Sequence, residues 1–258
     1  MPRDQGLTRA ELALLRRLRT PDRVQRFLDE LPYNHDCEPH TCFSPRLVLR
    51  HGRAHCLEGA LLAAAAFRVA GREPLIVDLA AVRDDDHVIA VFREAGGWGA
   101  VAKSSYSGLR FRDPVYRTLR ELVMSYFPCY YNPEGEKTLR GYSRPVNLRR
   151  FDRLGWMASE HDVWYIAEYL AAIPHVSLLT AAQARRLAPM DPWMYEAGLV
   201  GRRPRLVSKL ARRPEIADDA RFGDFAPARV EAGREAGGRV LEDLGKPELL
   251  RRRPVSRH

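Results

Sequence analysis

The chain has 258 residues, 45% of them apolar, which is enough for one domain with a full hydrophobic core plus an extension. No run approaches the roughly 20 consecutive apolar residues of a membrane span, and the first residues mix charges with apolar positions, unlike a signal peptide. We therefore expect a cytoplasmic protein with no membrane association. The four cysteines, Cys37, Cys42, Cys56 and Cys129, are too few for a disulfide framework and are expected to be reduced.

The chain is basic, with a net charge of +9 and a pI near 9.7. Only four of the 42 basic residues are lysines, and residues 201–258 hold 15 basic and 9 acidic residues, so much of the surplus lies at the end of the chain. We predict a domain over residues 1–200 and an Arg-rich, poorly ordered tail over residues 201–258. Nucleic-acid binding is expected, if at all, only through this tail.

The first part of the chain is predicted to be helical. Apolar residues at helical spacing over 8–19, and a second segment that starts at Pro21 and stops before Pro32, predict two covering helices. Residues 33–45 have no periodicity and are expected to form a loop. The next segment, 56–70, is Ala-rich, apolar on nearly every side and followed by Gly71, which predicts a buried helix.

Three short β-rich runs follow this helix, at residues 74–80, 87–93 and 98–103. The last two are joined by the hairpin turn 94–97, and a helix followed by such an antiparallel meander is typical of an α+β fold. Further along, we expect a helix over 114–131, an edge strand over 142–148 because Pro145 cannot join a central strand, and mainly helix over 151–200.

Cys56 and His87 are the candidate catalytic residues. A cysteine attacks as its thiolate, which the N–H groups and partial positive charge at a helix N-terminus favour, and Cys56 opens the buried helix. His87 begins the next strand but one, where its imidazole can serve as base for Cys56. The alternative interpretation is a buried structural cysteine and a solvated turn histidine.

The segments that carry these two residues resemble the core of the bacterial transglutaminase-like superfamily, which is related to papain. The resemblance covers about residues 22–110 and rests on Ala-His-Cys-Leu-Glu-Gly-Ala at 54–60, Gly-Arg-Glu-Pro-Leu-Ile-Val-Asp at 71–78, Asp-His-Val-Ile-Ala-Val-Phe-Arg at 86–93 and Gly-Gly-Trp at 96–98. It implies a Cys-bearing helix packed on a small antiparallel sheet, with additional covering helices. It also implies a cysteine nucleophile, Cys56, that forms an acyl-enzyme with His87 as base and passes the acyl group to water or an amine.

One member of the superfamily's usual triad is missing. Folding the hairpin places Lys103 nearly opposite His87, where the superfamily has an aspartate. A hydroxyl from Ser104 or Ser105 can orient the imidazole but cannot stabilise its charge as a carboxylate does. By the same resemblance Asn34 is a candidate oxyanion donor, with capping of the preceding turn as the alternative. Trp98 is expected to flank the dyad and shield it from water.

A zinc site is the rival interpretation of the loop, because His35, Cys37, His40 and Cys42 bring four possible ligands together within eight residues. Four ligands in one short loop would strain a tetrahedral site, so no metal and no cofactor is expected. The leading hypothesis is a cysteine-dependent amide hydrolase or acyl transferase acting on a peptide or an amide-containing small molecule. The alternatives are an inactive module that binds a peptide or protein in the same groove, and the weaker zinc or nucleic-acid roles.

Overall fold

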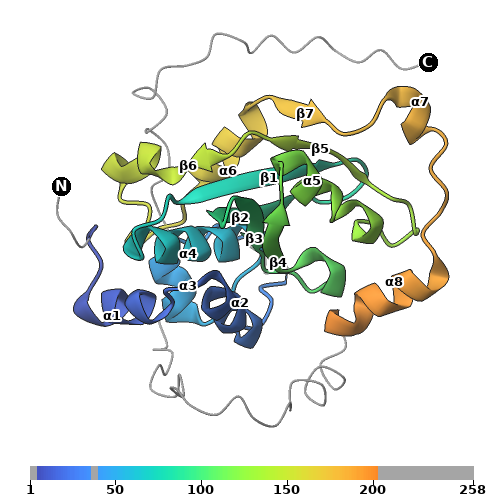
Figure 1. The fold of residues 1–258 in the computed structure, drawn as a ribbon. Helices are drawn as coiled ribbons and strands as arrows, with labels where there is room; N and C mark the ends of the chain where they lie inside the picture. The colour runs from blue at the N-terminus through green and yellow to red at the C-terminus, as the bar shows by residue number, and fades with distance from the viewer. Residues whose placement is uncertain (1–4, 36–39, 203–258) are drawn as a thin grey trace. The chain divides into compact units, whose positions relative to one another are not determined.

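The computed structural model of the chain describes residues 5–35 and 40–202 (Figure 1). Its N-terminal part is helical, with α1 (Arg9–Arg17), α2 (Pro21–Glu30), α3 (Pro45–His51) and α4 (Cys56–Val69). The two predicted covering helices and the buried Ala-rich helix are thus confirmed. The predicted tail lies outside the described residues except for its first two, and the domain boundary at residue 200 stays a prediction. No described helix is both long and apolar enough to cross a membrane.

A seven-stranded antiparallel sheet forms the centre of the described fold. Its strands are β1 (Leu75–Ala81), β2 (His87–Glu94), β3 (Gly97–Val101), β4 (Arg112–Tyr116), β5 (Leu139–Ser143), β6 (Val146–Asn147) and β7 (His175–Ser177). The order is β4-β3-β2-β1-β5-β7, with β6 paired to the start of β1. The predicted α+β class and the β1-β2-β3 meander are therefore confirmed.

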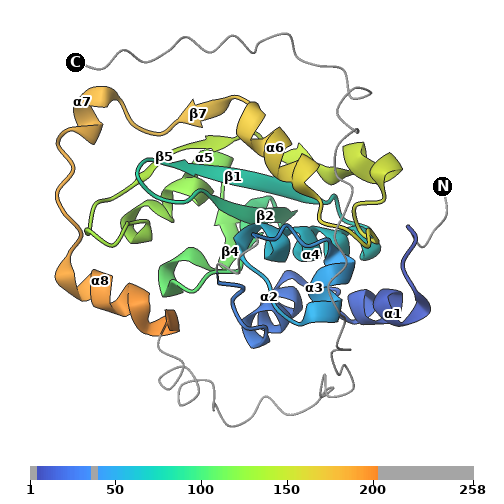
Figure 2. The ribbon, with the colours of Figure 1, turned by 180° about the vertical axis from the view of Figure 1, so that it is seen from behind.

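Both faces of the sheet are covered, which explains why β2 reads as an almost continuous apolar run. On one face, Ile76, Ala90 and Phe92 pack in one hydrophobic cluster with the N-terminal helices. On the other, Val77, Ile89 and Val91 pack with α5 (Leu119–Met124). Figures 1 and 2 show α2, α3 and α4 gathered on one side of the sheet and α5 on the other.

Helix α4 lies very close to the sheet, which fixes where its N-terminus meets β2. Its alanines are fully buried and leave little bulk between helix and strands. Gly59 is required by this packing, since a Cβ at this position would lie only 2.5 Å from the Cβ of Lys103, just beyond β3. The first turn of α4 is therefore held against the sheet at the end where β2 begins.

The second half of the chain differs from the prediction. Residues 112–116 form edge strand β4 with Pro114 inside it, and Thr118 then caps α5 by accepting a hydrogen bond from the Glu121 N–H, so the predicted helix over 114–131 is wrong at its start. The strand expected over 142–148 is split into β5 and β6 on either side of Arg144 and Pro145. The expected helical region contains strand β7 as well as helices α6 (Trp164–Ala172), α7 (Ala181–Ala184) and α8 (Pro192–Gly198).

The described residues also contain 3-10 helices. They are η1 (Ser107–Leu109), η2 (Phe127–Cys129), η3 (Leu148–Leu154) and η4 (Leu199–Arg202). The first of these, η1, lies between β3 and β4 and brings a backbone carbonyl to the candidate site.

Candidate functional site

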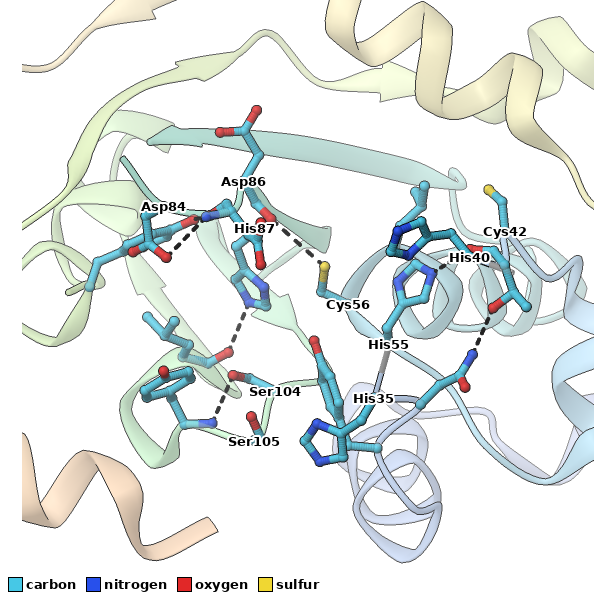
Figure 3. Close-up of a pocket in the computed structure, with 18 of the residues that line it drawn as sticks. His35, His40, Cys42, His55, Cys56, Asp84, Asp86, His87, Ser104 and Ser105 are labelled. Atoms are coloured by element: carbon cyan, nitrogen blue, oxygen red, sulfur yellow. Dashed lines mark hydrogen bonds between the residues drawn. The ribbon is translucent and has the colours of Figure 1, made fainter. Parts of the chain in front are cut away.

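Cys56 is the first residue of α4, and its side chain faces the start of β2 (Figure 3). The sulfur lies 3.9 Å from the backbone carbonyl oxygen of Asp86, which immediately precedes β2. Cys56 is partly exposed and lines a cavity of about 510 Å³. The structure thus brings the N-terminus of a buried helix, a thiol and a cavity to one place.

His87 lies at the same place and is held in one orientation. Its side chain is 5% exposed, and its Nε2 lies 3.0 Å from the carbonyl oxygen of Leu109 in η1. Because a carbonyl only accepts hydrogen bonds, Nε2 carries the proton in this contact and Nδ1 is left on the other side of the ring. The rings of Tyr126 and Tyr130 pack edge-on at 6.4 Å from the imidazole and fix its plane.

The turn before His87 is also fixed by hydrogen bonds. The Tyr130 hydroxyl donates to the Asp85 carbonyl at 2.7 Å, and the Thr138 hydroxyl donates to the Asp84 carboxylate at 2.6 Å. The Asp86 carboxylate accepts a 2.7 Å hydrogen bond from the Ala81 N–H. These three aspartates therefore form a structured rim of the cavity, on the β1-β2 turn.

A buried carboxylate, that of Glu58, lies two residues after Cys56 in the same first turn of α4. Glu58 has no exposed surface and accepts hydrogen bonds from the N–H groups of Phe43 and His55, each at 2.9 Å. The Thr41 hydroxyl and the Asn34 amide also donate to it, at 2.7 and 3.0 Å. Burial alone would raise the pKa of Glu58, but the His55 imidazole and these donors outweigh it and lower the pKa to about 2.

His55, the N-cap residue of α4, completes this arrangement. Its Nε2 lies 3.0 Å from the Thr41 carbonyl oxygen and 3.3 Å from Glu58 Oε1. Burial favours the neutral imidazole, but hydrogen bonds and charge from Cys56 and Glu58 raise the pKa of His55 to about 10. At neutral pH His55 therefore places a positively charged imidazole next to Cys56.

The pKa of the Cys56 thiol reflects both neighbouring histidines. Burial would raise this pKa, yet hydrogen bonds and positive charge from His55 and His87 lower it to about 5. At neutral pH this favours the thiolate, the form of cysteine that attacks electrophiles. Cys42 provides the contrast, because it is fully buried and burial raises the pKa of its thiol.

The structure changes the expected third member of the site. The hairpin has the register of the predicted turn, with Glu94 paired to Gly97 and Ala90 to Val101, but the Lys103 side chain turns away from His87. The Lys103 ammonium is buried and donates to the carbonyls of Leu28 and Leu31 at the end of α2.

Ser104 lines the cavity but accepts a hydrogen bond from the Tyr106 N–H at 3.0 Å. The orienting contact expected from Ser104 comes instead from the Leu109 carbonyl.

Asn34 and Trp98 differ in how close they come to the site. Asn34 is buried and lines the cavity, but its amide nitrogen donates to Thr41 and Glu58, so both amide hydrogens are directed away from a passing oxyanion. Trp98 pairs with Arg93, six residues along β2 from His87 or about 20 Å at the usual rise per residue. The expectation that Trp98 flanks the dyad is wrong, because the hairpin carries it to the opposite end of the strand.

The loop of possible zinc ligands is divided in the structure. Cys37 lies outside the described residues, Cys42 is buried in the hydrophobic cluster, and His35 and His40 line the cavity. Within residues 5–35 and 40–202, no group of three or more histidine, cysteine or acidic side chains is arranged to hold a metal ion. The zinc interpretation thus gains no set of ligands from the described part of the chain.

Three components of the site were not predicted from the sequence. They are His55 as a partner of the thiol, Glu58 as its buried counterion, and the Leu109 carbonyl that orients His87. The spacing of His55 and Glu58, three residues apart at the start of the helix, could have indicated that the two interact, since this is the spacing of a helix N-terminal capping box. The carbonyl carried no signal, because every residue has one.

Fold and site together define an antiparallel α+β protein whose cavity holds a cysteine beside two histidines. Comparison with models of known protein families gave no match, and comparison with curated protein sequences gave none either.

Proposed function

We propose that this protein is a cysteine-dependent amide hydrolase or acyl transferase with a transglutaminase-like core, in which Cys56 is the nucleophile and His87 the general acid and base. The observation that carries the proposal is the placement of the Cys56 thiol at a helix N-terminus, next to His87 and open to a cavity, where the neighbouring histidines lower its pKa. Perturbed groups that converge in a cavity are typical of active sites. The order of Cys-bearing helix, strand, His-bearing strand and third strand supports the transglutaminase-like assignment.

The proposed reaction has two steps. The Cys56 thiolate attacks the amide carbonyl carbon, a C–S bond forms, and the C–N bond breaks as the amine leaves with a proton from the His87 imidazolium. Water or a second amine then gives a proton to His87 and attacks the thioester, which releases the thiolate. The Cys56 backbone N–H, at the free N-terminal turn of α4, is in place to stabilise the negative oxygen of each tetrahedral intermediate.

The Leu109 carbonyl takes the position of the carboxylate in the proposed mechanism. It fixes the tautomer of His87, so that Nδ1 is the nitrogen available to Cys56. It does not offset the charge of an imidazolium as a carboxylate does.

Labelling with an electrophilic acyl probe tests this proposal. We expect the probe to modify Cys56 in the wild-type protein, no modification at this position in Cys56→Ala, and labelling reduced by at least about tenfold in His87→Ala, since general acid–base catalysis contributes about 10²–10⁴-fold. Cys129, which is partly exposed and outside the cavity, is the internal reference thiol. Equal labelling of Cys56 and Cys129 at neutral pH would contradict the proposal.

A peptide- or protein-binding module is the second candidate, and the missing carboxylate favours it. In that case Cys56 still reacts with the probe, but the acyl group is not released to water or to an added amine. Mass spectrometry of the labelled protein over time separates the two functions, because an enzyme returns to its unmodified mass. Nucleic-acid binding through residues 201–258 concerns a segment outside the described residues and remains a prediction.

A further inference from the structure

Glu58 is an unusual neighbour for a nucleophile that must be negative. Its carboxylate has no exposed surface and lies within one helical turn of Cys56. Four hydrogen bonds solvate it, from the N–H groups of Phe43 and His55 and the side chains of Thr41 and Asn34. All four donors are neutral, so they stabilise the charge without cancelling it, and a buried charge is costly unless it is also paired.

His55 is the cation that the structure places on this carboxylate. Its Nε2 lies 3.3 Å from Glu58 Oε1 and 3.0 Å from the Thr41 carbonyl oxygen, two acceptors that both favour a protonated nitrogen. His55 and Cys56 are consecutive residues that line the same cavity, so a charge on the His55 ring acts directly on the sulfur. One imidazole therefore connects a permanent negative charge to the nucleophile.

We propose that His55, fixed by Glu58 and Thr41, is a standing positive charge beside the Cys56 sulfur, while His87 is the residue that exchanges protons. The role in turnover rests on the proposed function. During acylation His87 gives its proton to the leaving amine, so it can no longer stabilise a thiolate by charge. His55 stays charged because the buried Glu58 carboxylate, 3.3 Å from Nε2, favours the imidazolium over the neutral ring, and it stabilises the sulfur again when the thioester breaks. It is a positioning residue that acts through Cys56.

Other titratable groups also lie close to this pair. Tyr130 and Asp78 act electrostatically on the sulfur from the sheet side, and Cys42 does so from the loop before α3. Asp162, before α6, adds negative charge near His55. None of these is a cation. Of the residues that the structure describes around the sulfur, His55 and His87 supply the positive charge.

The test is the pH dependence of iodoacetamide alkylation in the full-length protein, read at Cys56 alone by peptide mass spectrometry. The wild-type midpoint is expected near 5. His55→Asn keeps a side chain suited to an N-cap but removes the charge, and we expect the midpoint to rise by at least about one pH unit, which slows alkylation at pH 5 several-fold. An unchanged midpoint in a folded His55→Asn protein would overturn the inference.

His51→Asn is the matched control. His51 lies at the end of α3, where its ring stacks on Phe43 at 4.7 Å, and it is not among the groups that lower the thiol pKa. Its replacement should leave the midpoint where it is. A shift as large as that of His55→Asn would show that any disturbance of this region moves the thiol, and would also overturn the inference.

A measurement on the wild-type protein covers the case in which His55→Asn does not fold. NMR of ring-labelled histidines should show His55 still protonated at pH 8, where an ordinary histidine is neutral. A neutral His55 ring at pH 7 overturns the inference. Neither measurement needs a substrate. A shifted midpoint together with an acyl probe that ignores Cys56 would therefore reject the proposed function and leave the role of His55 standing.

Discussion

At the scale of single residues, Glu58 matters for stability as well as for the site. Glu58→Gln keeps the shape of the side chain but removes its negative charge. Its amide hydrogens would then face N–H groups that donate to the carboxylate in the wild-type protein. His55 also loses its counterion. We expect the free energy of unfolding at pH 7, measured with urea, to fall by about 3–5 kcal/mol, because removing one member of a buried ion pair leaves the other buried and unpaired.

The control is Glu94→Gln, which removes the carboxylate of an exposed pair with Arg72. Its effect should be below about 1 kcal/mol. The pH profile adds a second check. The pKa of Glu58 is lowered to about 2, so its contribution is present above the unfolded value near 4.5 and is lost as pH falls toward 2. Glu58→Gln should flatten this part of the wild-type profile, and parallel profiles would contradict the assignment.

The candidate residues were predictable from the sequence to different degrees. Cys56 and His87 could be found because each sits at an element boundary that the hydrophobic pattern reveals, and the structure brings the two together. His55 and Glu58 can be identified in the sequence as a histidine and a glutamate, but their burial cannot be predicted from it. Trp98 was misplaced because its position was inferred from resemblance, whereas the strand pairing carries it to the far end of β2.

At the scale of elements, an ion pair ties α4 to η3 and can be compared with a similar pair at the surface. Arg68 donates two hydrogen bonds to Asp152, at 2.7 and 2.6 Å, and the two side chains are 13% and 15% exposed. Arg68→Met should lower the free energy of unfolding by about 1.5–3 kcal/mol, since hydrogen bonds to charged groups away from water contribute in this range.

Arg83 provides the matched control for that substitution. It makes the same two-pronged contact with Glu136, at 2.8 and 2.9 Å, but these side chains are 64% and 43% exposed. Arg83→Met should change the free energy of unfolding by less than about 1 kcal/mol in the same urea titration. Equal losses in the two variants would mean that burial does not decide the strength of these pairs.

The elements that the sequence predicted well are those whose pattern comes from their own burial. Helix α4 and strands β1 to β3 are apolar because they are covered, and this burial is visible as an apolar pattern in the sequence. Strands β4 and β7 were missed because both are short edge strands with exposed residues, Val115 and Val176 among them. Edge strands owe their conformation to a neighbouring strand, so local propensity identifies them poorly.

At the scale of the whole molecule, the low pKa of Cys56 depends on the folded structure. The N-cap of α4 supplies His55 and strand β2 supplies His87, and only the packed sheet brings β2 to the helix N-terminus. In denaturing urea we expect the alkylation midpoint of Cys56 to move from about 5 to the ordinary thiol value near 8.5. The same peptide mass spectrometry measures both states.

This shift also gives the sign of a pH effect on stability. A thiol whose pKa falls on folding stabilises the folded state fully above the unfolded value near 8.5, and this contribution is lost as pH falls toward 5. Cys56→Ala should remove it, so the variant should lose less stability than the wild type between pH 8 and pH 5. A midpoint that stays near 5 in urea would show that the adjacent histidine alone is responsible.

The sequence by itself determined the α+β class, the buried Cys-bearing helix, the three-strand meander and the nearness of Cys56 to His87. These follow from hydrophobic period, glycine and proline positions, and chain order, all of which act locally. The tertiary structure decided the burial of the Lys103 ammonium at the end of α2, the Leu109 carbonyl as partner of His87, and the Glu58–His55 pair next to Cys56. Those depend on distances between segments far apart in the chain and on the removal of water from a carboxylate, which only packing can bring about.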